Sequence, residues 1–231
     1  MDETIKTILY SWVERKIPEI IPRDLSLDKY TDMNIKKIVA ITGFRRVGKT
    51  YLILHLIEDL LKNKNRKEVI YVNFDDERIL QSTEFLTHLI PTIKQTFDNK
   101  IQYLFLDEIQ DMPNWSKWLR RVYDTEDFNI FITGSSSKVS SKEMPTELRG
   151  RCLEVQVFPL SFKEFLNFKN IRIDIKNLSY SENEKAKLFR QLEEYLRYGG
   201  MPEIVLSKEA LKNDILQQYY GTVVRKDIIE R

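Results

Sequence analysis

Apolar runs alternate with amphipathic segments along most of the chain. Runs rich in β-branched and aromatic residues predict buried strands at 35–43, 67–74, 101–108 and 128–137. Apolar residues that recur every three to four positions predict intervening helices at 48–61, 82–97 and 114–125. The segment 151–160 mixes apolar with polar residues, which indicates a strand nearer an edge. Strands alternating with helices predict an α/β fold, with a parallel sheet flanked by helices.

The pattern differs at both ends of the chain. A first helical stretch ends before Pro18. After Pro159 the expected helices are 161–168, 181–200 and 201–231, the last interrupted near Gly221. The segment 171–180 fits either a strand or irregular structure. We therefore expect a core at 1–160 that includes the N-terminal helical segment, and a helical lid at 161–231.

Composition limits the classes of protein. The chain has 231 residues, 42% of them apolar, which suffices for a packed core with a small lid. The formal net charge is only +2, which disfavours a protein with a large basic surface around which nucleic acid winds. The sole cysteine, Cys152, rules out a disulfide within the chain, and we interpret it as a small residue in a strand. No signal peptide and no apolar run of about 20 residues is recognisable, so we expect a soluble, cytoplasmic protein without a membrane partner.

A phosphate-binding loop follows the first predicted strand. Residues 43–50, GFRRVGKT, match the pattern G-x-x-x-x-G-K-[ST] in full. Gly43 lets the chain turn off the strand, and Gly48 permits a positive φ and close approach of backbone to phosphate. Lys49 is expected along the β- and γ-phosphates, and Thr50 is expected to place its hydroxyl on Mg²⁺.

The rest of the loop is expected to surround the anion. Backbone amides from Val47 to Tyr51 can point inward at the start of the following helix, where the helix dipole favours negative charge. The same nucleotide-binding stretch includes Phe44, Arg45 and Arg46. For the two arginines, contact with phosphate, contact with a neighbouring subunit and solvent exposure on the outer side of the loop all remain open.

Polar residues that follow the later strands predict the rest of the site. Asp107 comes directly after an apolar strand, where it is the expected Mg²⁺ ligand, directly or through water. Glu108 is the expected general base or water-positioning residue. Thr133 and Ser135 are candidates to contact the γ-phosphate or the attacking water, and a helix cap explains Ser135 equally well. Asp75 and Asp76 either orient waters of Mg²⁺ or belong to a turn after their strand.

An arginine that reaches the γ-phosphate accelerates hydrolysis by about 10³ to 10⁵ in related enzymes. Arg151 is the main candidate, because it begins a predicted strand, and it could serve its own site or that of a neighbour. Arg149 is interpreted as a surface residue, and Arg197 is a weaker candidate in the lid.

Together these segments resemble the AAA+-like P-loop ATPases of archaea and bacteria. The most specific matches are LDEIQ, PLSFKEF and GGMPE, and the similar stretches span most of 38–231. The resemblance implies the strand order 5-1-4-3-2, a helical lid after the core, ATP or ADP with Mg²⁺ as ligands, and the site roles given above. Family members commonly continue past RKDIIER into a less characterised C-terminal domain. The lid of this chain lacks an obvious second-sensor arginine beside GGMPE.

Three functions are compatible with this sequence. The first is Mg²⁺-dependent ATP hydrolysis that drives movement of the lid or a partner domain, in a homo-oligomer if the arginine is supplied between subunits. The second is a nucleotide-gated binding switch with little turnover. The third is a nucleic-acid-associated motor or effector, suggested by basic residues at 36–37 and 62–67. The protein or nucleic-acid partner is not predictable from these motifs.

Overall fold

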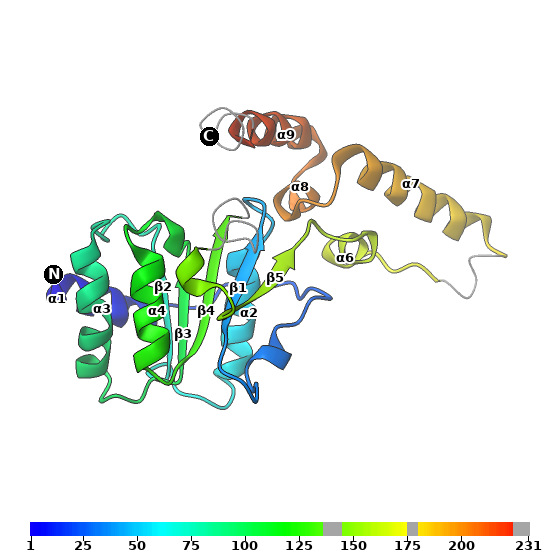
Figure 1. Ribbon diagram of the computed structural model, residues 1–231. Coiled ribbons are helices and arrows are strands. Elements are labelled where there is room, and N and C mark those ends of the chain that lie inside the picture. The colour runs from blue at the N-terminus through cyan, green and yellow to red at the C-terminus, as the bar shows by residue number, and fades with distance from the viewer. Residues whose placement is uncertain (136–144, 175–179, 224–231) are drawn as a thin grey trace. The chain divides into compact units, whose positions relative to one another are not determined.

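The computed structural model describes residues 1–135, 145–174 and 180–223, and its first unit contains a five-stranded parallel sheet (Figure 1). The strand order is β2-β3-β4-β1-β5, which confirms the predicted parallel sheet and its order 5-1-4-3-2. The strands are β1 (Ile38–Gly43), β2 (Val69–Asn73), β3 (Tyr103–Asp107), β4 (Asn129–Ser135) and β5 (Cys152–Val157). Every residue of β1 and β3 is buried, whereas β5 is partly exposed, as expected for an edge strand.

Helices cover both faces of this sheet. Figure 1 shows α3 (Thr83–Thr96) and α4 (Trp115–Thr125) on the near face and α2 (Lys49–Leu60) on the far face. The near-face core contains alternate strand residues such as Ile70, Leu104 and Ile130, because successive side chains of a strand point to opposite faces. Ser82 caps α3, because its side chain accepts a hydrogen bond from the backbone amide of Phe85.

The N-terminal helix α1 (Asp2–Glu14) protects an edge of the sheet. It packs against α3 and against the edge strand β2. The indole Nε1 of Trp12 donates a hydrogen bond to the carbonyl oxygen of Val69 at 2.8 Å. An edge strand otherwise leaves such groups unpaired, so the helix satisfies part of the β2 backbone.

The contacts divide the chain into two units. The first unit is Met1–Phe44 with Lys49–Val157, and the second is Arg45–Gly48 with Phe158–Arg231. The second unit contains α6 (Phe162–Phe168), α7 (Glu182–Tyr198), α8 (Pro202–Leu206) and α9 (Glu209–Val223). The assignment of 1–160 to an ATPase core and of 161–231 to a lid stays a prediction.

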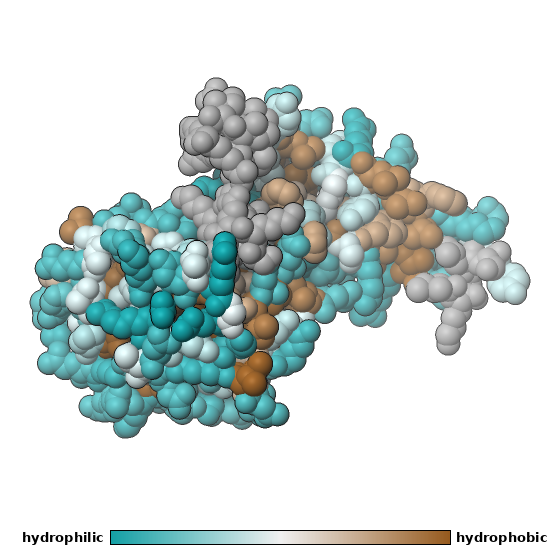
Figure 2. All heavy atoms as spheres, viewed as in Figure 1, coloured by the Kyte–Doolittle hydropathy of each residue, from teal (hydrophilic) through white to brown (hydrophobic). Residues whose placement is uncertain are grey.

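Serine caps and short breaks separate the helices of the second unit. Ser161 forms a capping box with Glu164, and the Ser181 side chain caps α7. The expected interruption near Gly221 is wrong, because this glycine lies within α9 and the break falls between α8 and α9. Of the undecided segment, residues 171–174 are irregular, and 175–179 lie outside the described residues. Figure 2 shows hydrophobic surface over α7, where Phe189 and Leu196 are exposed.

Candidate functional site

The phosphate-binding loop lies between the carboxyl end of β1 and the first turn of α2. Gly48 has φ 99°, a conformation that glycine adopts without strain, and Arg46 has φ 62°. Lys49 and Thr50 open α2, so the loop ends at a helix N-terminus. Backbone amides and the helix dipole make such a terminus a binding site for anions.

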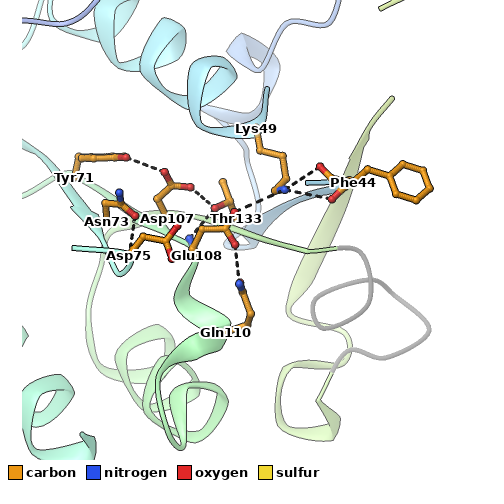
Figure 3. Close-up of polar contacts among 10 residues, drawn as sticks. Phe44, Lys49, Tyr71, Asn73, Asp75, Asp107, Glu108, Gln110 and Thr133 are labelled. Atoms are coloured by element: carbon orange, nitrogen blue, oxygen red, sulfur yellow. Dashed lines mark hydrogen bonds and ion pairs between the residues drawn. The ribbon is translucent and has the colours of Figure 1, made fainter. Parts of the chain in front are cut away.

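The side chain of Lys49 folds back over its own loop. It is only 4% exposed, and its Nζ donates hydrogen bonds to the carbonyl oxygens of Gly43 and Phe44, each at 3.2 Å (Figure 3). The same Nζ lies 3.7 Å from Oε1 of Glu108. The lysine ammonium therefore lies between the loop and the first carboxylate beyond β3.

The other residues of the predicted nucleotide contact differ in exposure. Thr50 is half-buried and Val47 is buried. Phe44 and Tyr51 are both 54% exposed, and the Phe44 ring points away from the polar cluster in Figure 3.

The two loop arginines differ in their contacts. Arg45 is exposed. Within the second unit, the guanidinium of Arg46 forms an ion pair with Glu203 at 3.0 Å and lies 4.9 Å from the centre of the Tyr219 ring. Hydrogen bonding by Tyr219, followed by the Arg46 ion pair, lowers the pKa of Glu203 below its usual value. Of the sequence alternatives for Arg46, the structure fits solvent exposure, because the side chain is 54% exposed, and it adds the ion pair with Glu203.

Asp107 ends β3 and is fully buried. Its Oδ2 accepts a hydrogen bond from the Tyr71 hydroxyl at 2.8 Å, and its Oδ1 accepts one from the hydroxyl of Thr133. Burial, reinforced by the charge of Asp107, raises the pKa of Tyr71 far above its usual value, so the phenol stays protonated as a donor. Both oxygens of Asp107 are thus held in fixed positions by residues of β2 and β4.

Glu108 follows in a left-handed backbone conformation, with φ 56° and ψ 38°. This conformation is uncommon for a residue with a side chain and marks local strain. Its backbone amide donates to Oγ1 of Thr133 at 2.9 Å. Its Oε2 accepts a hydrogen bond from Nε2 of Gln110 at 2.6 Å, while its Oε1 lies near Lys49.

Thr133, near the end of β4, contacts both carboxylate residues of the site. Thr133 links Asp107 and Glu108 directly, and its expected contact with the γ-phosphate or the attacking water stays a prediction. Ser135 pairs with Gly43 in the sheet register, but its side chain lies outside the described residues. Nothing in the structure therefore bears on its expected contact with the γ-phosphate.

The acidic residues after β2 form a turn. The backbone amide of Asp75 donates to Oδ1 of Asn73 at 3.1 Å. Asp76 forms an ion pair with Arg78 at 2.6 Å, and hydrogen bonding by Arg78 lowers the pKa of Asp76. The turn interpretation of the sequence accounts for both contacts.

Arg151 lies at the opposite end of the sheet. Its carbonyl oxygen accepts a hydrogen bond from the amide of Ile38 at 2.9 Å, and its Nε lies 3.5 Å from Asp124. The phosphate loop leaves β1 at Gly43, five residues farther along the strand, or about 16 Å away at the usual rise. That distance exceeds the reach of an arginine side chain, so Arg151 does not contact its own phosphate loop. Arg149 is exposed, as expected.

Arg197 belongs to the second unit. It is exposed in the last turn of α7, where its guanidinium lies 5.2 Å from the ring of Tyr198.

Two residues of the site had no assigned role in the sequence analysis. Tyr71 lies in an otherwise aliphatic buried strand, and a buried hydroxyl needs a partner, which was the available signal. Gln110 belongs to the motif LDEIQ, but nothing in the motif reveals which side chain it contacts.

The donor set fits Mg²⁺. Asp107 provides a carboxylate and Thr50 a hydroxyl near the anion-binding loop, and Mg²⁺ is usually bound by one or two carboxylates together with phosphates and waters. Each oxygen of Asp107 accepts one described side-chain hydrogen bond and keeps a further lone pair.

Comparisons with known proteins identify related sequences. A family model described as AAA domain matches residues 35–166. An uncharacterised protein of Methanocaldococcus jannaschii is 41% identical, over 96% of this chain and 51% of its own length. An uncharacterised protein of Haemophilus influenzae is 31% identical, over 89% of this chain and 49% of its own. The chain thus spans about half the length of these curated relatives.

A solved structure supports the fold. The Saccharomyces cerevisiae Hsp104–ADP complex aligns with 96% of this chain and 34% of its own, at 13% identity and a TM-score of 0.55. Among the residues described here, no helix is both long enough and apolar enough to span a bilayer.

Proposed function

The chain belongs to the AAA domain family, and we propose that it binds ATP with Mg²⁺ and hydrolyses it. One observation carries this proposal: Oε1 of Glu108 lies 3.7 Å from the buried Nζ of Lys49, beside the phosphate-binding loop. A base and a phosphate-binding cation meet at the place where a γ-phosphate would lie.

Nucleotide binding would use the loop and Lys49. The triphosphate would take the place of the two carbonyl oxygens that now accept hydrogen bonds from Lys49. Thr50 and Asp107 would hold Mg²⁺, which offsets the negative charge of the β- and γ-phosphates. ATP rather than another nucleotide is proposed from membership in the family.

Hydrolysis would use Glu108 as the general base. Its carboxylate accepts a proton from a water whose oxygen bonds to the γ-phosphorus, while the bond from that phosphorus to the bridging oxygen breaks and ADP leaves with the electron pair. Thr133 fixes the positions of Glu108 and Asp107 relative to each other. Its hydroxyl accepts a hydrogen bond from the backbone amide of Glu108 and donates one to the side chain of Asp107.

Hydrolysis is further proposed to drive movement of the helices that follow the core, or of a partner domain. A neighbouring subunit would supply Arg151, because this residue lies too far from its own loop. No described contact favours the nucleic-acid function. Several basic residues behind that hypothesis bond within the first unit: Lys36 to Glu126, Lys37 to Gly150, Lys62 to Asp59, and Lys64 to Gln102.

Phosphate release from Mg²⁺-ATP tests the proposal. We expect Glu108→Gln to lower kcat by about 10²- to 10⁴-fold while ATP still binds, because the loop and Lys49 remain. Glu84→Gln is the matched control, since Glu84 is exposed in the first turn of α3 and should leave kcat unchanged.

The opposite result is equally definite. Wild-type turnover no higher than that of Glu108→Gln would refute hydrolysis at this site. Tight ATP binding together with that result would favour the nucleotide-gated switch instead.

A further inference from the structure

Gln110 is a buried polar residue beside the proposed general base. It lies in the short 3-10 helix η2 (Ile109–Asp111), directly after β3, and is 8% exposed. Its Nε2 donates to Oε2 of Glu108 at 2.6 Å. Its Oε1 is buried and accepts no hydrogen bond from the described part of the chain. A buried carbonyl without a partner costs stability, so packing alone does not explain a glutamine at this position.

The hydrogen bond makes the two oxygens of Glu108 unequal. Gln110 holds Oε2, whereas Oε1 faces Lys49 and the phosphate-binding loop. When Lys49 turns to the phosphates of a bound nucleotide, the contact with Gln110 can persist, because both residues follow β3 within three positions. Oε1 then remains available to accept a proton.

The backbone of Glu108 is also restrained. Its left-handed conformation turns the chain from β3 into η2, and its amide is bonded to Thr133. The residue is thus fixed at its backbone by Thr133 and at one carboxylate oxygen by Gln110. Such restraint matters because a displacement of about 1 Å at a reacting group can cost 10²-fold in rate.

We propose that Gln110 is a positioning residue that orients the Glu108 carboxylate toward the attacking water. This inference rests on the proposed hydrolysis and adds to it a role for the last residue of LDEIQ. Gln110 contacts no reacting atom itself and acts through Glu108.

The test compares steady-state hydrolysis of Mg²⁺-ATP by wild type, Gln110→Leu and Gln110→Glu. Gln110→Leu removes the donor, and we expect kcat to fall about 10-fold while KM and the Kd for ATP stay unchanged. Gln110→Glu keeps the size of the side chain but places a second carboxylate against Glu108, so its kcat should fall further. Gln102→Leu is the control, because Gln102 precedes β3 at the amino end of the sheet and bonds to Lys64 and Glu68.

The double variant separates positioning from packing. If Gln110 acts through Glu108, then Gln110→Leu has no further effect on the residual kcat of Glu108→Gln. An equal fold-loss in both backgrounds would assign Gln110 a packing role and overturn the inference. Circular dichroism and the thermal midpoint of each variant establish that it folds. If Gln110→Leu does not fold, Gln110→Glu takes its place in this comparison.

Two negative results have different meanings. Wild-type protein without turnover refutes the proposed hydrolysis, and the inference falls with it. Wild-type turnover that Gln110→Leu and Gln110→Glu match refutes the positioning role alone.

Discussion

The hydroxyl of Tyr71 donates a hydrogen bond to Oδ2 of Asp107 at 2.8 Å. The Tyr71 ring lies 5.2 Å from that of Trp12, so a residue of α1 packs against the donor that orients this carboxylate. Groups that hydrogen-bond to a metal ligand orient it, and their removal typically lowers metal affinity or activity by 10- to 100-fold. Tyr71 is therefore placed to tune the proposed Mg²⁺ ligand without touching the ion.

Tyr71→Phe should raise the Mg²⁺ concentration for half-maximal ATP hydrolysis by about 10-fold, because Asp107 loses one of its two side-chain donors. A titration of turnover with Mg²⁺ at saturating ATP measures this. Tyr103→Phe is the control, since Tyr103 is also a buried tyrosine, and its hydroxyl bonds only weakly to Thr31 at 3.4 Å, away from the site. Identical titrations for Tyr71→Phe and wild type would contradict the role of Tyr71.

Arg151→Ala should lower kcat at least 10³-fold if a neighbouring subunit uses this arginine. Because the arginine and the phosphate loop then come from different chains, mixing Arg151→Ala with Lys49→Ala should restore part of the turnover. Arg149→Ala is the control, as Arg149 is exposed and lies two residues before Arg151. Unchanged turnover for Arg151→Ala would show that Arg151 has no catalytic role and would leave its ion pair with Asp124 as a structural contact.

Cys152 should react slowly with thiol reagents in the folded protein. Burial raises its pKa to about 12 from a usual value of 9.0. The raised pKa lowers the thiolate fraction, and only the thiolate reacts, so labelling at pH 8 should be about 1,000-fold slower than in urea. Labelling rates with and without denaturant measure this, and equal rates would show that the folded protein does not shield the thiol.

Glu194→Ala should destabilise the second unit. Lys212 is 3% exposed and pairs with Glu194, with Glu209 at 3.5 Å as its other partner. Removing Glu194 leaves this ammonium buried with a weaker partner, which should lower the free energy of unfolding by about 3 kcal/mol. Urea denaturation followed by circular dichroism tests this, with the exposed Glu193→Ala on the same helix as control.

The stability difference between wild type and Glu194→Ala should depend on pH. Burial opposes the charge of Glu194, but hydrogen bonds from Lys169 and Lys212 outweigh it and lower the pKa below 4.5. A lowered folded-state pKa stabilises the fold above the unfolded pKa, and this contribution is lost as the pH falls through the folded value. The difference in the free energy of unfolding between wild type and Glu194→Ala should therefore shrink as the pH falls below 4.5. A difference that grows with acid would contradict the pairing.

Local pattern accounts for most of the fold. The pattern of apolar residues predicted both the strand that ends at Gly43 and the helix that begins at Lys49. Residues close together in the chain show by their spacing which faces of a strand or helix are buried. The break after α8 was misplaced to Gly221, since a glycine lowers helix stability by only about 1 kcal/mol and tertiary packing can override it.

By itself, the sequence determined the G-x-x-x-x-G-K-[ST] loop and the pair of carboxylates at the end of β3, because each depends on residues adjacent in the chain. Only the tertiary structure decided which distant side chains reach them. Tyr71 meets Asp107 because β2 pairs with β3 in a particular register, and Arg151 lies far from Gly43 because β5 runs parallel to β1. The pairing of particular residues across neighbouring strands is a property of the assembled sheet, so no single segment shows which side chains will lie opposite each other.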